Sequence, residues 1–98
     1  MKLMAYWKIH QDNRQDVFSS FAAMELEEYQ SQQGPNVKII GRWHDVINGT
    51  GVAICETDDL DALAQWLMPY QAICDFEIVP VLDDEEAHST ARKAYPAD

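Results

Sequence analysis

Residues 37–57 read VKIIGRWHDVINGTGVAICET, and this segment decides the fold. Two apolar runs are joined by Asn48-Gly49, a dipeptide that favours the tight type I′ turn of a β-hairpin because both central positions need a positive φ angle. The segment therefore predicts one strand over 37–47 and a returning strand over 51–57. A two-residue turn also sets the partners across the hairpin, which are Ile47 with Thr50, Trp43 with Ile54 and Arg42 with Cys55.

The residues before the hairpin predict a strand followed by a helix. Residues 3–9 alternate between apolar and other side chains with period two, as a half-buried strand does. Apolar residues then recur at helical spacing, at Phe18, Phe21, Ala22 and Tyr29. Gly34-Pro35 cannot continue a helix, so we expect a single helix that ends by Gln33.

The residues after the hairpin repeat this order. A second helical stripe is formed by Leu60, Leu63, Ala64 and Leu67, and Pro69 ends it. Residues 75–82 predict the last strand, with Pro80 favouring a position at the edge of the sheet because proline has no N–H to donate.

This order of elements predicts an α+β fold of the ferredoxin-like, or split βαβ, type. Such a fold has a four-stranded antiparallel sheet with two helices on one face, and its strands lie in the spatial order fourth, first, third, second. We assign residues 1–84 to this domain. Residues 85–98 form a tail that runs from acidic to basic, which is compatible with a short helix or with a frayed end.

Charge and composition narrow the class of protein. Lys and Arg number 7 against 17 Asp and Glu, for a formal net charge of −10. This charge argues against binding to nucleic acids and to anionic membrane surfaces. No apolar run approaches the ~20 residues that cross a bilayer, and the N-terminus lacks a signal-peptide core, so we expect a cytoplasmic protein.

Cysteine and histidine spacing points to neither a disulfide nor a metal site. Cys55 and Cys74 have no CxxC spacing and are expected to be free thiols that pack as small apolar groups. No pair among the His and Cys residues has the spacing of zinc ligands. We expect no metal and no cofactor.

The faces of the predicted sheet can be assigned from strand parity. One face is expected to lie under the helices, with Gly41 giving a helix room, and contains Leu3, Ala5, Trp7, Ile39, Gly41, Trp43, Val52, Ile54, Phe76 and Ile78. The opposite face contains Met4, Tyr6, Lys8, Ile40, Arg42, His44, Val46, Ala53, Cys55, Glu77, Val79 and Val81. A three-residue turn would change the register and place Glu56 opposite Arg42.

The uncovered face predicts a partner and a site. Its apolar side chains would form an exposed patch too large for a monomer, so we expect a homodimer in which two sheets close into a barrel. Tyr6, Arg42, His44 and Glu77 would line the space between the sheets, with Arg42 and His44 facing Glu77 of the second copy. They could bind an anionic or carbonyl-bearing small molecule, or Arg42 and Glu77 could form an interface salt bridge without a ligand.

Three stretches carry a resemblance to a known family. GRWH at 41–44, GVAICETDD at 51–59 and DFEIVPVLDD at 75–84 resemble short bacterial proteins catalogued as a domain of unknown function within the dimeric α+β barrel group. The resemblance extends to Glu86 and implies the fold and a homodimer. It implies no activity and no catalytic residues.

The sequence is compatible with three functions. The first is a homodimeric module that binds a small organic ligand between its two sheets. The second is a small enzyme without a cofactor, of oxygenase or isomerase type, that uses His44 and Arg42. The third is an interaction protein with a filled interior. An open space around Arg42 and His44 would favour the first two.

Overall fold

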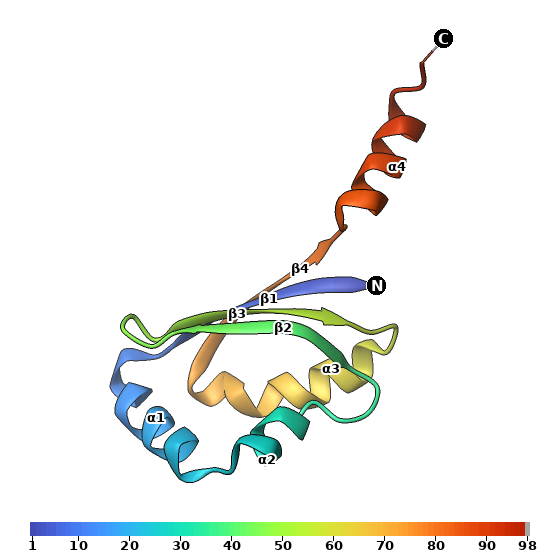
Figure 1. Ribbon diagram of the computed structural model, residues 1–98. Coiled ribbons are helices and arrows are strands. Elements are labelled where there is room, and N and C mark those ends of the chain that lie inside the picture. The colour runs from blue at the N-terminus through green and yellow to red at the C-terminus, as the bar shows by residue number, and fades with distance from the viewer. Residues whose placement is uncertain (98) are drawn as a thin grey trace.

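The computed structural model describes residues 1–97 and has a four-stranded antiparallel sheet at its centre (Figure 1). Its strands are β1 (Lys2–Ile9), β2 (Lys38–Asp45), β3 (Thr50–Glu56) and β4 (Cys74–Val81). They lie in the order β2-β3-β1-β4. The α+β class, the ferredoxin-like strand order and the edge position of Pro80 are therefore confirmed.

Helices cover one face of this sheet and leave the other open (Figure 1). The covering elements are α1 (Arg14–Ala23), α2 (Leu26–Ser31), α3 (Leu60–Leu67) and the short 3-10 helices η1 (Gln11–Asn13) and η2 (Met68–Ala72). The core lies between the sheet and α3, where the buried cluster is Leu3, Val37, Ala53, Cys55 and Leu63. Both cysteines are buried, free thiols.

The single helix expected before Gln33 is in fact broken into α1 and α2. Met24 and Glu25 are extended and separate the two helices. On an unbroken helix Phe21 and Tyr29 would be about 12 Å apart along the axis, yet their ring centroids are 4.6 Å apart. The break lets both helices direct aromatic side chains into the same space under the sheet.

The hairpin turn also differs from the prediction. Asp45 pairs with Thr50, so residues 46–49 form a four-residue loop. Gly49 has a φ of 68°, whereas no other residue type within 1–97 has a positive φ, so Asn48 cannot occupy a type I′ turn. Instead the Asp45 carboxylate accepts hydrogen bonds from the Asn48 backbone N–H at 3.1 Å and from its side-chain amide at 2.9 Å.

The two faces of the hairpin are the reverse of those expected. Pairing of Leu3 with Cys55 and of Ala5 with Ala53 places these small β3 residues under the helices. Arg42 and His44 lie opposite Ala53 and Gly51, so they too face the helices. The open face instead has these hairpin residues, which were predicted to be covered: Gly41, Trp43, Val52 and Ile54.

Two glycines explain this choice of face. A Cβ on Gly51 would lie 2.0 Å from Cζ2 of Trp7, so only glycine leaves space for this indole on the covered face. A Cβ on Gly41 would lie 2.3 Å from Cη2 of Trp43, on the open face. Gly41 therefore makes room for Trp43 and not for a helix. A bulge at Ile40 returns Ile39 to the covered face, opposite Cys55.

The C-terminal segment is a helix, α4 (Asp84–Ala94), and not a frayed tail. Asp83 and Glu86 form a capping box at its start, and Lys2 Nζ donates to Glu86 Oε1 at 2.9 Å. The helix extends from the end of β4 away from the domain, on the side of the sheet opposite to α1, α2 and α3 (Figure 1). All its residues are exposed.

Candidate functional site

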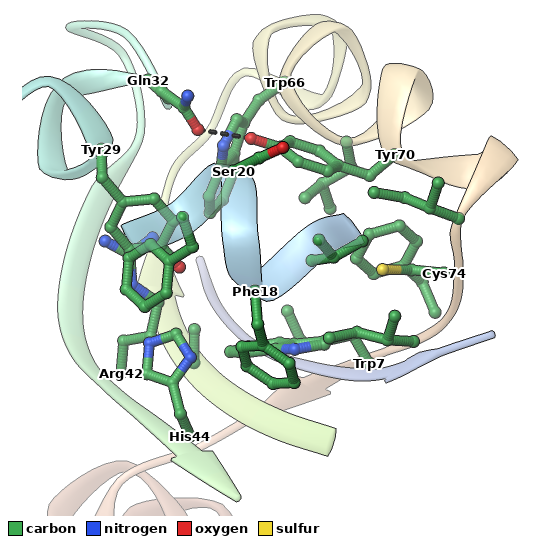
Figure 2. Close-up of a pocket in the computed structure, with 18 of the residues that line it drawn as sticks. Trp7, Phe18, Ser20, Tyr29, Gln32, Arg42, His44, Trp66, Tyr70 and Cys74 are labelled. Atoms are coloured by element: carbon green, nitrogen blue, oxygen red, sulfur yellow. Dashed lines mark hydrogen bonds between the residues drawn. The ribbon is translucent and has the colours of Figure 1, made fainter. Parts of the chain in front are cut away.

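A cavity of about 180 Å³ lies between the covered face of the sheet and the helices. Ala5 and Ala53 form part of its floor, because their short side chains leave space that the helices do not fill. Its walls are mainly aromatic (Figure 2), and the rings come from six elements of the fold: Trp7, Phe18, Phe21, Tyr29, Trp66, Tyr70 and Phe76. Such an apolar, concave space is typical of small-molecule sites.

Arg42 brings a positive charge to one end of this cavity. Its guanidinium carbon lies 4.2 Å from the centroid of the Tyr29 ring, in a cation–π contact. The ion pairs within residues 1–97 do not include Arg42. Among the described residues that line the cavity, none is Asp or Glu. The charge is therefore held in place by an aromatic ring and left available to a ligand.

His44 lies beside Arg42 and contacts three aromatic rings, although part of its side chain is exposed to solvent. Its imidazole stacks on Phe21 at 5.6 Å and meets the edge of Trp7 at 5.5 Å, both measured between ring centroids. Burial lowers the pKa of His44 below its usual 6.5, and the positive charge of Arg42 lowers it further. At neutral pH the imidazole is thus uncharged and has one donor and one acceptor nitrogen.

Hydroxyl and thiol groups around the cavity remain protonated at neutral pH. Burial raises the pKa of Tyr29 and of Tyr70, and the charge of Arg42 opposes that rise in both. Burial also raises the pKa of the Cys74 thiol. Tyr70 donates a hydrogen bond to Gln32, which ties η2 to the residue after α2 across the cavity (Figure 2).

A second, open groove adjoins the cavity along β2 and α2. Four residues line both spaces and form the wall between them: Phe21, Tyr29, Arg42 and His44. The side-chain oxygen of Gln33, which lines the groove, is buried without a hydrogen-bond donor among residues 1–97. Arg42 and His44 therefore stand where the cavity meets the outer surface.

The four predicted site residues fall into two pairs on opposite faces. Arg42 and His44 line the cavity together, as their spacing on one strand predicted. Tyr6 and Glu77 pair across β1 and β4 on the open face. Arg42 and His44 therefore point away from the face on which contact with Glu77 of a second copy was expected. Glu56 lies opposite Lys2 and Lys38, not Arg42.

Sequence reasoning missed the cavity itself and two of the aromatic residues in its wall. Tyr29, Trp66 and Tyr70 line it, although only Tyr29 belonged to a predicted stripe. The available signal was the pair Ala5 and Ala53 on neighbouring strands, since two small side chains side by side leave space above the sheet.

The described residues offer neither a cluster of metal ligands nor a membrane-spanning helix. In the described residues no group of three or more His, Cys, Asp and Glu side chains is arranged to hold a metal ion. No helix within residues 1–97 combines the length and the apolar character needed to cross a membrane.

The depressed pKa of His44 predicts how stability depends on pH. Below about pH 6.5 the unfolded chain binds a proton at His44 that the folded chain resists, so the free energy of unfolding should decrease as pH falls through this window. Urea unfolding at pH 7.0 and 5.5 measures the decrease. It should be smaller for His44→Gln, and an equal decrease in both proteins would contradict the assignment.

The comparisons with known proteins give a family but no activity. No curated protein sequence matches the chain. The family model described as a domain of unknown function, DUF3303, matches residues 1–95 and so covers nearly the whole chain, including α4. The chain therefore belongs to the DUF3303 family.

Proposed function

We propose that this protein binds a small organic molecule in the cavity between its sheet and its helices. The observation that carries the proposal is the aromatic cavity of about 180 Å³ with Arg42 and His44 together at one end. Ligand sites commonly combine apolar walls with a few convergent polar groups that orient the ligand. The site proposed here lies within one chain, under the helices, instead of between two sheets.

Binding of toluene, a single uncharged ring, can be followed by the NMR signals of the three tryptophan side chains. Two of these line the cavity, and the third serves as a reference. Trp7 and Trp66 line the cavity, whereas Trp43 is 62% exposed on the open face. Titration with toluene should shift the indole N–H signals of Trp7 and Trp66 in ¹H–¹⁵N NMR spectra and leave that of Trp43 in place.

A filling variant tests the location. Ala53→Ile adds a branched side chain to the cavity floor and should abolish these shifts, while Ala23→Ile, at an exposed position outside the lining, should retain them. Absence of the shifts in the wild-type protein, or their persistence in a folded Ala53→Ile variant, would disprove the proposed site.

An enzyme without a cofactor is the second candidate, and His44 is the observation that favours it. A neutral imidazole beside a guanidinium could take a proton from a carbon next to a ligand carbonyl, while the electron pair moves onto the carbonyl oxygen near Arg42. Deuterium exchange at that carbon of phenylpyruvate, faster than in buffer and lost in His44→Gln, would distinguish this enzyme from a binding module. Exchange at the buffer rate would exclude it.

The open face supports a second proposal, that two copies of the chain pair through it. The strand register places four rows of side chains across this face. The central rows, which are apolar or aromatic apart from one carboxylate, are Val79, Met4, Ile54 and Gly41, and then Glu77, Tyr6, Val52 and Trp43. The outer rows contain most of the charges and are Val81, Lys2, Glu56 and Lys38, and then Asp75, Lys8, Thr50 and Asp45. An apolar centre with a polar rim is typical of protein interfaces.

Charge favours a second copy as the partner on this face. The four rows contain three lysines and four carboxylates, so the face is close to neutral, whereas the whole chain has a net charge of −10. Two copies that meet here keep most of their negative charge away from the contact, which minimises repulsion between them. Helix α4 extends on this side of the sheet, where it could contact the second copy (Figure 1).

A further inference from the structure

The size of the cavity limits the part of a ligand that it can enclose. A cavity of about 150 Å³ lined by apolar side chains holds benzene. The cavity of this protein, at about 180 Å³, is slightly larger, so it has space for one six-membered ring and a small substituent. Its aromatic walls also suit a ring, because aromatic groups gain from offset and edge-to-face contacts beyond their buried area.

The charged residues around the cavity determine whether a positively or a negatively charged ligand is favoured. Within residues 1–97 no Asp or Glu lines either the cavity or the adjoining groove, although acidic residues are the commonest charged residues of the chain. Arg42 is the one charged residue in the cavity lining, and it forms no ion pair within residues 1–97. A cationic ligand would meet repulsion here, whereas an anion would find a guanidinium partly shielded from water, where charge pairs are stronger.

The groups around Arg42 suit a planar anion in particular. The guanidinium presents several N–H donors in one plane, a geometry that matches the two oxygens of a carboxylate. Its contact with the Tyr29 ring restrains that plane. His44, which lines the same end of the cavity, can donate a further hydrogen bond to a carboxylate oxygen from one nitrogen.

We infer that the ligand is a single-ring aromatic acid whose ring fills the cavity and whose carboxylate binds Arg42, with His44 beside it. This inference rests on the proposed ligand-binding function and specifies its ligand class. The two can fail separately, since an uncharged ring could occupy the cavity without any contribution from Arg42.

Benzoate, benzamide and benzylammonium test the inference because they share a ring and differ in charge. Titrations at pH 7 on the full chain, followed by the Trp7 and Trp66 indole signals, should show that benzoate binds more tightly than benzamide and that benzylammonium binds most weakly. Arg42→Gln should weaken benzoate binding by about 10- to 100-fold, the value of a charge-assisted hydrogen bond, and change benzamide binding by less than about threefold.

Two further variants show whether the effect comes from the guanidinium itself. Arg42→Lys retains the charge but not the paired donors, so it should have an intermediate affinity for benzoate. Arg92→Gln removes the same charge from the exposed helix α4 and should leave the affinity unchanged. The affinities are compared only after the NMR spectrum of Arg42→Gln shows that this variant is folded.

The outcomes separate the ligand class from the site. The inference is overturned if benzamide or benzylammonium binds as tightly as benzoate, or if Arg42→Gln and Arg92→Gln have the same effect. Binding of toluene without binding of benzoate would overturn the inference and leave the proposed function intact. If toluene also fails to bind, the proposed function fails with it.

Discussion

Gly51→Ala is expected to destabilise the protein by about 2–3 kcal/mol, towards the upper end of the cost of overpacking a core. The new Cβ would lie 2.0 Å from Cζ2 and 2.4 Å from Cε2 of Trp7. The edge of the indole meets the His44 ring, with centroids 5.5 Å apart, and the indole forms part of the cavity wall, so moving it away from the new Cβ disrupts both. Urea unfolding with a tryptophan fluorescence readout measures the loss of stability.

Gly41→Ala is the matched control for this substitution. Its Cβ would also overlap an indole, at 2.3 Å from Cη2 of Trp43, but Trp43 is 62% exposed in the single chain and can turn away from the sheet there. Both variants are therefore compared at a protein concentration below that at which the proposed dimer forms. We expect Gly41→Ala to cost less than Gly51→Ala. In addition, Trp7→Leu should reduce the cost of Gly51→Ala, since the two side chains would no longer collide. Equal costs at both glycines would contradict the description of the covered face.

Val79→Asp is expected to separate the proposed dimer into monomers. Val79 lies in a central apolar row of the open face, next to Met4. An unpaired carboxylate buried there costs about 3 kcal/mol or more, which weakens association at least about 100-fold. Light scattering at micromolar concentration should give twice the chain mass of 11.2 kDa for the wild type and 11.2 kDa for the variant.

Val46→Asp provides the control with the same change of side chain. Val46 lies in the loop between β2 and β3, outside the four rows, and is 58% exposed. This variant should remain dimeric. A wild-type protein that is monomeric at micromolar concentration, or a Val79→Asp variant as dimeric as Val46→Asp, would refute pairing through the open face.

The order of the elements could be predicted because it depends on local patterns. Alternation over 3–9, the helical stripe at Leu60 and Leu63, and the stops at Gly34-Pro35 and Pro69 each act within a few residues. The turn was only partly predictable. Asn48-Gly49 marked its place and Gly49 has the expected positive φ, but the Asp45 carboxylate holds Asn48 in a longer loop.

The face of the hairpin could not be predicted, because strand parity is a relative property. The spacing of Arg42 and His44 shows that they share a face, and this is confirmed. It does not show whether that face is the one with Leu3 or the one with Tyr6, since this depends on how β3 pairs with β1, over 40 residues away in the chain. Because the hairpin was assigned to the wrong face, the four expected site residues lie in two pairs on opposite faces of the sheet.

The sequence by itself determined an acidic α+β domain, its strand order, its free cysteines and the common orientation of Arg42 and His44. Only the tertiary structure decided that these two residues lie under the helices, at the end of an aromatic cavity. The physical reason is steric. The Trp7 ring needs the space above Gly51, and this places Gly51 together with Ala53, Arg42 and His44 on the covered face. Trp43, on the other side of the same strand, is thereby left on the open face.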